Sequence, residues 1–245
     1  MRQTALSPWG EYVERFRRGE WRDRIFHDMV LADARRRPRP RTVLDVGCGR
    51  GFDGNLEFQA SLARAADRYV GIEPDPEVGP AACFSETHRC LFEDAPLAPG
   101  SVDVAFAIMV LEHLAEPQRF WDKLHEVLAV GGVFWALTVD GRHWFARAAL
   151  LAQKLRVKDY YLDRFIGERG VERYENYPVH YRCNTPAAVA RFAGAFRSCE
   201  FVSFSRVGQC NYYYPRLFHG LADRLDRRAI RLGKPGVLLA VRAVK

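Results

Sequence analysis

A short glycine-rich stretch carries the clearest sign of chemistry in this sequence. The stretch VLDVGCGRG alternates Gly47, Gly49 and Gly51 with other residues directly after an apolar run. Glycine lets a backbone turn tightly and approach a ligand closely, and the N-terminus of a following helix attracts anionic groups. The segment NLEFQASLARAA, which follows, has the composition of such a helix. The pattern predicts a nucleotide-type pocket at a strand-to-helix turn.

The spacing leaves two classes of nucleotide open. Gly49, Gly51 and Gly54 also satisfy the G-x-G-x-x-G pattern of dinucleotide-binding proteins. Glu73 ends the next apolar run, 22 residues after Gly51. A carboxylate there can accept hydrogen bonds from ribose hydroxyls in either class. Spacing alone therefore does not decide between them.

Three histidines are candidate general bases, because the reference pKa of histidine, about 6.5, suits proton transfer near neutral pH. His113 follows the fourth apolar run and His143 the fifth, so both are expected at the carboxyl edge, where α/β sheets bind ligands. His180, in YPVHYRCNTP, can reach in from a later segment. For His113, a structural role in orienting the segment after the strand is the alternative.

No metal site is expected. Glu112 and His113 are adjacent, so their side chains cannot easily face one ion, and no further ligands show metal spacing. The six cysteines lack C-x-x-C spacing and the density of a disulfide scaffold, so we interpret them as reduced thiols.

The elements that position these residues are short apolar runs separated by amphipathic segments. The runs are TVLDV, YVGIE, RCLFE, VDVAFAIM and GVFWALTV. Strands that alternate with helices form parallel βαβ units, so an α/β fold is predicted. Residues 8–37 are expected to form a helix, residues 185–197 a helix with Thr185 as N-cap, and CEFVSFSRV and GVLLAVRAV two closing strands around a helix near residues 217–232.

Five motifs in this order resemble the class I S-adenosylmethionine (SAM)-dependent methyltransferases, in particular the type 11 group that acts on small molecules and glycans. They are VLDVGCGRG, YVGIEPD, LFEDAPL, VDVAFAIMVLEHL and GGVFWALT, and the resemblance is strong over residues 40–140. It implies a Rossmann-like seven-stranded sheet, mostly parallel with an antiparallel last strand, and helices on both faces. It also implies SAM as cofactor, with S-adenosylhomocysteine as product.

The resemblance also assigns cofactor-binding residues. Asp45 and the glycines, with Cys48 among them, surround the methionine end and the ribose, Glu73 binds the ribose hydroxyls and Pro74 lies against the adenine. By the same resemblance the remaining cofactor contacts are Asp94 at the adenine amino group, the Ala95 amide at the ring, and Ala107 and Ile108 along the cofactor.

We interpret residues 1–245 as one methyltransferase domain in four parts. Residues 1–40 are a helical extension, 41–140 the SAM-binding core, 141–183 a lid or substrate insertion, and 184–245 the last helix and strands six and seven. The start of the sequence lacks the apolar segment of a secretory signal, so a cytoplasmic location is expected.

The acceptor is expected to be a small molecule, a sugar or a lipid-linked glycan, methylated on oxygen. The fourth strand ends in AIMVLEHL and lacks the Asn/Asp-Pro-Pro-Tyr/Phe turn typical of methyltransferases that act on nucleobase amino groups. A local resemblance of NYPVHYRCNTP to some bacterial type 11 enzymes suggests that Tyr181 and Arg182 face the substrate. Arginine can bind a carboxylate or phosphate with two parallel hydrogen bonds.

Charge and apolar patterning bear on larger partners. The chain has a net charge of +7, with +5 on residues 1–41 and +6 on residues 209–245, so the centre is acidic and a nucleic-acid partner is disfavoured. The segments 143–157 and 212–234 mix apolar residues with arginine as interfacial helices do, although such stripes are more often core faces. Proximity to a membrane surface stays open, and the oligomeric state is not predicted.

Rival functions make different predictions. An NAD(P)-dependent oxidoreductase would bind a nicotinamide cofactor and usually carry a Tyr-x-x-x-Lys-like proton donor, which we do not find. A non-catalytic binding module would have lost the glycines or acidic positions, which are present. An RNA methyltransferase would bind RNA strongly through the basic ends, in a salt-dependent way.

Overall fold

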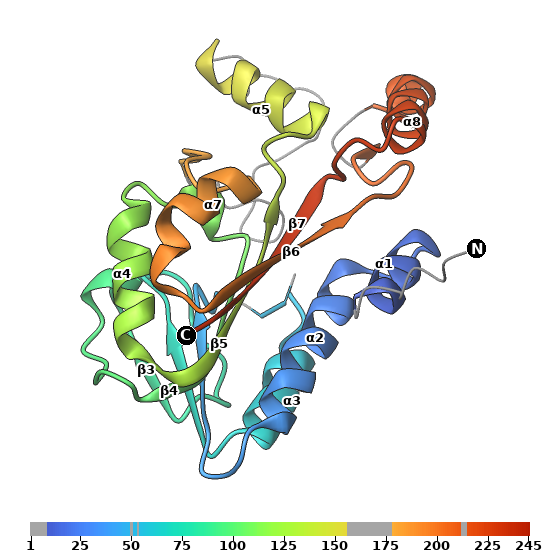
Figure 1. Ribbon diagram of the computed structural model, residues 1–245. Coiled ribbons are helices and arrows are strands. Elements are labelled where there is room, and N and C mark those ends of the chain that lie inside the picture. The colour runs from blue at the N-terminus through green and yellow to red at the C-terminus, as the bar shows by residue number, and fades with distance from the viewer. Residues whose placement is uncertain (1–8, 50, 53, 156–177, 212–214) are drawn as a thin grey trace.

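The computed structural model describes residues 9–49, 51–52, 54–155, 178–211 and 215–245 (Figure 1). A seven-stranded sheet runs through its centre in the order β3-β2-β1-β4-β5-β7-β6. The strands are β1 (Thr42–Val46), β2 (Arg68–Ile72), β3 (Glu86–His88), β4 (Val102–Ile108), β5 (Leu128–Val139), β6 (Ser198–Phe204) and β7 (Leu238–Val244).

Only β7 runs against the others within this sheet. It lies between β5 and β6 and pairs antiparallel with both, from Val133↔Val244 on one side and Ser198↔Val244 on the other. The pairs β1–β2, β1–β4, β2–β3 and β4–β5 are all parallel. The carboxyl ends of β1, β2, β4 and β5 therefore meet at one edge, which confirms the predicted fold class.

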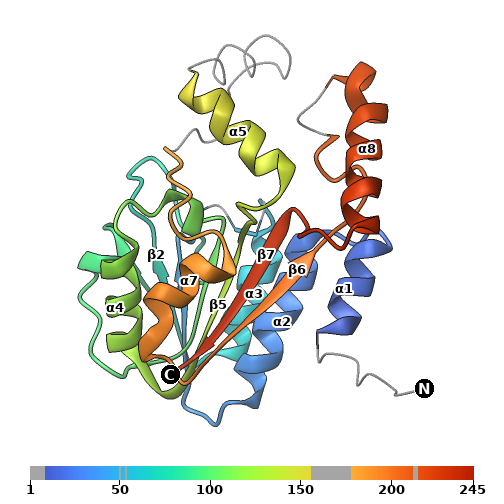
Figure 2. The same ribbon diagram turned by 45° about the horizontal axis from the view of Figure 1, so that its top comes forward.

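Helices cover both faces of the sheet (Figures 1 and 2). One face packs against α1 (Gly10–Arg17), α2 (Arg22–Arg36) and α3 (Leu56–Ala65), and the other against α4 (Pro117–Val127) and α7 (Pro186–Phe192). Each face has its own core, because alternate strand residues point to opposite sides. The large buried side chains include Phe26, Phe106 and Trp135 on the first face and Phe120 and Trp121 on the second.

Two helices stand beyond the carboxyl edge of the sheet. They are α5 (Trp144–Lys154), which follows β5, and α8 (Arg216–Arg231), which precedes β7 (Figure 2). Three short 3-10 turns, Phe92–Asp94, Leu111–His113 and Ala193–Ala195, complete the described elements. Residues 156–177 of the expected insertion lie outside the described residues.

Two sequence predictions are wrong in detail. The single helix expected over residues 8–37 is two helices, because Gly19 adopts a φ of +102° between them and Trp21 is extended. The third strand is Glu86–His88 rather than RCLFE, since after His88 the chain leaves the sheet and Phe92 turns into the core against Phe120.

Other local predictions are confirmed. Thr185 caps α7, where its hydroxyl accepts a hydrogen bond from the Ala188 amide, and Pro186 is the first helical residue. The helix expected near residues 217–232 is α8, and the two closing strands are β6 and β7.

Candidate active site

The glycine loop follows β1 and is fixed to β2. The amides of Gly47 and Cys48 both donate to the carbonyl of Ile72, at 2.8 and 2.9 Å. Gly47 has a φ of +70°, and a Cβ there would lie 2.6 Å from Cγ2 of Val110. A Cβ on Gly51, whose φ is +100°, would lie 2.8 Å from the carbonyl oxygen of Asn55. The loop therefore has no room for side chains at these two positions.

Glu73 lies against this loop. Its Oε2 accepts a hydrogen bond from the Gly49 amide at 2.8 Å, and Oε1 accepts one from the Asp75 amide at 2.9 Å. Glu73 as a whole is only 7% exposed. The structure thus brings together the two features that the sequence linked only by spacing. Each carboxylate oxygen can accept more than one hydrogen bond, so the group suits ribose hydroxyls as well.

Asp45 lies beneath the loop. Its Oδ2 accepts hydrogen bonds from Nε2 of Gln59 and the hydroxyl of Tyr69, both at 3.0 Å, and the same Gln59 nitrogen donates to the Cys48 carbonyl at 2.8 Å. Burial raises the pKa of Asp45 to about 7. The side chain of Cys48 is also buried. Asp45 therefore supports the loop through Gln59, a contact that its place in the motif did not predict.

The end of β4 faces the loop from the other side. Ala107 is buried in the α4-side core, whereas Ile108 packs, half-buried, against the core under α2. Met109 then takes a φ of +53°, which is unusual for a residue with a side chain, and its amide donates to Leu137. This turn sets Val110 against Gly47. Sequence reasoning missed both Met109 and Val110, because no residue type signals a left-handed methionine.

The predicted adenine contacts lie around the turn after β3. Asp94 is exposed and pairs with Arg119 of α4 at 2.9 Å, while the Ala95 amide donates to the carbonyl of Phe92. Pro74 is exposed directly after Glu73. The roles assigned to these residues at the adenine stay predictions.

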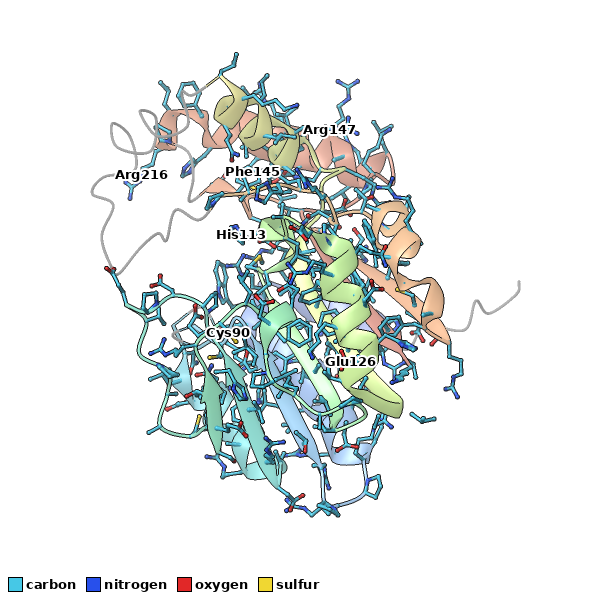
Figure 3. All side chains as sticks on the ribbon, turned by 90° about the vertical axis from the view of Figure 1, so that its left-hand side faces the viewer. Cys90, His113, Glu126, Phe145, Arg147 and Arg216 are labelled. Atoms are coloured by element: carbon cyan, nitrogen blue, oxygen red, sulfur yellow. The ribbon has the colours of Figure 1, made fainter. Side chains whose placement is uncertain are left out.

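His113 ends the turn after β4, at the carboxyl edge and beneath α5 (Figure 3). Its Nδ1 lies 2.8 Å from the carbonyl oxygen of Pro178. A carbonyl can only accept, so Nδ1 carries the proton and the neutral ring keeps its lone pair on Nε2. This is the tautomer that a general base at Nε2 requires.

The segment from Pro178 to Asn184 crosses the same turn. The backbone amides of His180 and Tyr181 both donate to the Glu112 carbonyl, at 2.7 and 3.1 Å, and Nη1 of Arg182 donates to the Ala115 carbonyl at 2.6 Å. Tyr181 has a φ of +50°. Of the predicted catalytic and substrate residues, four therefore gather here. They are His113, His180, Tyr181 and Arg182.

His143 is placed differently. It is 6% exposed and caps α5, where its Nδ1 accepts a hydrogen bond from the Phe145 amide at 3.3 Å. Its Nε2 lies 3.9 Å from Oδ1 of Asp226 in α8. Burial lowers the pKa of His143, against the opposing effect of Asp226 and Asp140. These contacts fit a residue that joins α5 to α8.

A buried polar network lies under the Pro178–Asn184 segment. The Thr138 hydroxyl donates to Oε2 of Glu112 at 2.6 Å, and Nδ2 of Asn184 donates to the Thr138 oxygen at 2.5 Å. Glu112, Thr138 and Asn184 are each at most 4% exposed, and burial raises the pKa of Glu112. The network joins the turn after β4, strand β5 and the Pro178–Asn184 segment. The Glu112 side chain therefore points into the protein, whereas that of its neighbour His113 contacts Pro178.

Known proteins resemble this part of the chain. Residues 44–136 match the methyltransferase domain family, and they contain the glycine loop, Glu73 and His113. This part of the chain is therefore similar to a methyltransferase domain. No group of three histidine, cysteine or acidic side chains suited to a metal ion occurs among the described residues.

Curated relatives match part of this chain. An uncharacterized methyltransferase of Mycobacterium sp. (strain JLS) is 40% identical over 110 residues, which are 43% of this chain and 42% of the relative. One from Mycobacteroides abscessus is 36% identical over 106 residues, 39% of this chain and 38% of the relative. The matched region therefore spans less than half the length of either relative.

Solved structures share the fold of most of this chain. The methyltransferase of Haloferax volcanii, solved with its activator, aligns at a TM-score of 0.58 and 16% identity over 96% of this chain and 95% of that chain. Geranyl diphosphate C-methyltransferase of Streptomyces coelicolor, solved with S-adenosyl-L-homocysteine, aligns at 0.54 and 12% identity over 89% and 77%. The fold is thus that of the SAM-dependent methyltransferases.

We expect Asn184→Asp to unfold at lower urea concentration than wild type, by about 1–3 kcal/mol in the free energy of unfolding. The substitution keeps the size of the side chain but removes the donor to Thr138 and adds a carboxylate beside buried Glu112. Gln118→Glu, the same change from amide to acid at an exposed position of α4, is the control. A wild-type midpoint for Asn184→Asp would show that the network does not stabilise the fold.

We expect Asp45→Asn to become more stable relative to wild type as pH rises from about 4 to about 7. In the folded protein the Asp45 pKa is about 7, against about 3.9 in an unfolded chain, so the folded state retains a proton that the unfolded state has lost. Wild-type stability therefore falls over this window, and the amide removes this contribution. Thermal midpoints of both proteins across the window measure it, with Asp122→Asn on α4 as control. A constant difference in midpoint contradicts the prediction.

Proposed function

We propose that this chain is a SAM-dependent methyltransferase that transfers a methyl group to a hydroxyl of a small molecule, a sugar or a lipid-linked glycan. The observation that carries the cofactor is the Glu73 carboxylate on the Gly49 amide, beside Gly47, where a side chain does not fit. This cradle suits a nucleoside whose ribose lies against the loop. NADH binding alone would instead support an oxidoreductase.

The residues present fit SAM in charge as well as in shape. Asp45 and Glu73 are two buried carboxylates close to the loop. Besides burial, the charge of Glu73 raises the pKa of Asp45, and the charges of both raise the pKa of the Cys48 thiol, so additional negative charge is unfavourable here. A cationic ligand offsets this negative charge. Glu73 would bind the ribose hydroxyls, and Asp45 would complement the cationic methionine end through the loop it supports.

When bound, SAM supplies a methyl group whose bond to sulfur breaks with the electron pair staying on sulfur, so that S-adenosylhomocysteine leaves and a carbon–oxygen bond forms. His113 would take the hydroxyl proton on Nε2, because its Nδ1 proton is directed at the Pro178 carbonyl. The remaining contribution of the protein is to hold the acceptor in line and exclude water.

Acceptor recognition would fall to the Pro178–Asn184 segment. The Tyr181 backbone amide donates to the Glu112 carbonyl and the Arg182 side chain donates to the Ala115 carbonyl, so both residues contact the turn that carries His113. The Arg182 guanidinium presents five N–H groups, so it can bind a carboxylate or phosphate next to its Ala115 contact. We favour His113 as the base over His180, because the contact between His180 and the turn is made by its backbone amide. We also favour it over His143, which is buried against α8.

Calorimetric titration tests the cofactor. Wild type is expected to bind SAM and S-adenosylhomocysteine, and Glu73→Ala to bind both roughly 10- to 100-fold more weakly, because hydrogen bonds to a charged group contribute about 1.5–3 kcal/mol. Glu77→Ala, an exposed acidic residue of the same turn, is the control. Equal affinity of Glu73→Ala and wild type for both ligands would remove the central support for the proposal.

Transfer of labelled methyl from SAM into cell-extract fractions tests the acceptor and the base. We expect label in small-molecule or glycan fractions, and a rate for His113→Gln that is about 100- to 10,000-fold lower with an unchanged SAM Kd. His125→Gln, which changes a histidine packed on Phe196, is the control. Label that ribonuclease releases would establish an RNA methyltransferase instead, and a normal rate for His113→Gln would exclude His113 as the base.

A further inference from the structure

Helix α8 leaves most of its large apolar side chains in water. Its buried face consists of small or acidic residues, chiefly Ala222 and Asp226, which are 5% and 3% exposed. Five large apolar side chains of α8 are exposed. They are Leu217 at 87%, Leu221 at 59%, Phe218 at 45%, and Leu225 and Ile230 at 38% each. The stripe seen in the sequence is therefore not a core face.

Four of these exposed side chains form one continuous strip, and Ile230 lies on the opposite side of the helix. Leu217, Leu221 and Leu225 are spaced by four residues, and Phe218 lies beside them, so at 3.6 residues per turn they cover about 100° of the helix surface. Leu232, 59% exposed just past the helix end, continues the same line. We call these four residues and Leu232 the α8 strip.

The charges on α8 are divided between its two sides. Both acidic residues face the protein: Asp226 accepts hydrogen bonds from Nε1 of Trp144 and the Gly208 amide, each at 2.9 Å, and Asp223 accepts one from Asn211 at 3.0 Å. The arginines of α8 are all exposed, and they adjoin or interrupt the α8 strip. They are Arg216, Arg224, Arg227, Arg228 and Arg231. The outward surface of this helix is therefore apolar and cationic only.

The position of α8 is also informative. It stands with α5 beyond the carboxyl edge of the sheet, on the side where His113 lies (Figures 2 and 3). Helix α5 adds exposed Leu151, at 57%, and Arg147, with Leu155 just after it at 63%. No helix of the described residues is long and apolar enough to cross a bilayer. This end of the molecule thus presents apolar and cationic groups without a spanning segment.

We propose that the α8 strip binds the surface of an anionic lipid bilayer, with α8 lying in the plane of the interface. An apolar face flanked by arginines is the pattern of interfacial helices, in which apolar side chains enter the acyl boundary and cations meet lipid phosphates. A second copy of the chain fits this surface less well, because its own five arginines would face these five. The proposal concerns binding only and stands independently of the methyl acceptor.

Sedimentation with vesicles tests the proposal on the full chain. We expect binding to vesicles of phosphatidylcholine and phosphatidylglycerol at 7:3, and little to phosphatidylcholine alone. Leu221→Glu should lower the partition coefficient by about tenfold or more, because it places a charge where an apolar side chain would enter the membrane. Val130→Glu, at a residue that is 94% exposed near the opposite edge of the sheet, should leave it unchanged.

The arginines give a second measurement. The double variant Arg224→Gln and Arg227→Gln should lose roughly 25-fold in partitioning at low salt, about fivefold for each charge, and the loss should shrink as salt rises. Arg64→Gln on α3 is the control. Circular dichroism melting of every variant separates lost binding from lost folding. Because the substituted side chains are exposed, we expect wild-type melting temperatures.

Two outcomes would overturn the proposal. One is wild-type protein that stays in the supernatant with both vesicle types. The other is a dimer on gel filtration that Leu221→Glu dissociates while vesicle binding is unaffected, because the α8 strip would then bind a second copy.

Discussion

The backbone at Gly47 lies so close to Val110 that no side chain fits between them, and much of the site depends on this close approach. It holds the end of β1 against the end of β4, while the shared Ile72 carbonyl holds the same loop to β2. Three strand ends are thereby fixed relative to one another. The Gly49 amide is left pointing at Glu73, and the left-handed turn at Met109 directs the chain onward to His113. The positions of the candidate cofactor and base residues thus follow from one steric constraint.

Two buried carboxylates stiffen this arrangement from opposite sides. Asp45 joins the loop to α3 through Gln59. Glu112 joins the turn after β4 to Thr138 of β5, which in turn accepts a hydrogen bond from Asn184 of the Pro178–Asn184 segment. Burial raises the pKa of both groups, so each is costly to ionise in the folded protein. Hydrogen-bonded partners offset that cost and fix the carboxylates in place. The site is therefore held by polar contacts beneath it as well as by the packed sheet.

The sheet and the glycine loop could be predicted from the sequence because they depend on local pattern. Apolar runs that are followed by Gly47 or end at Glu73 indicate strand ends, and this signal does not depend on contacts with distant parts of the chain. The Asn184–Thr138–Glu112 network could not be predicted, since it joins residues 46 and 26 positions apart whose types also suit ordinary surface sites. The prediction of the third strand was wrong because the strand is short. An edge strand of three residues has too few positions to show a period, and Phe92 made the following turn look like a strand.

Helix α8 shows why an apolar stripe alone does not locate a core. Its periodicity is as strong as that of α4, yet α4 buries Phe120, Trp121 and Leu124 while α8 exposes its leucines. The difference lies in the residues that dock each helix. On α8 a single buried carboxylate, Asp226, receives Trp144 and the Gly208 amide, and this polar attachment turns the apolar side outward. Because exposed apolar area of this size is unfavourable in water, the orientation is stable only if the attachment is stronger or if another surface covers the strip. The exposed arginines along the same side favour a covering surface that is anionic.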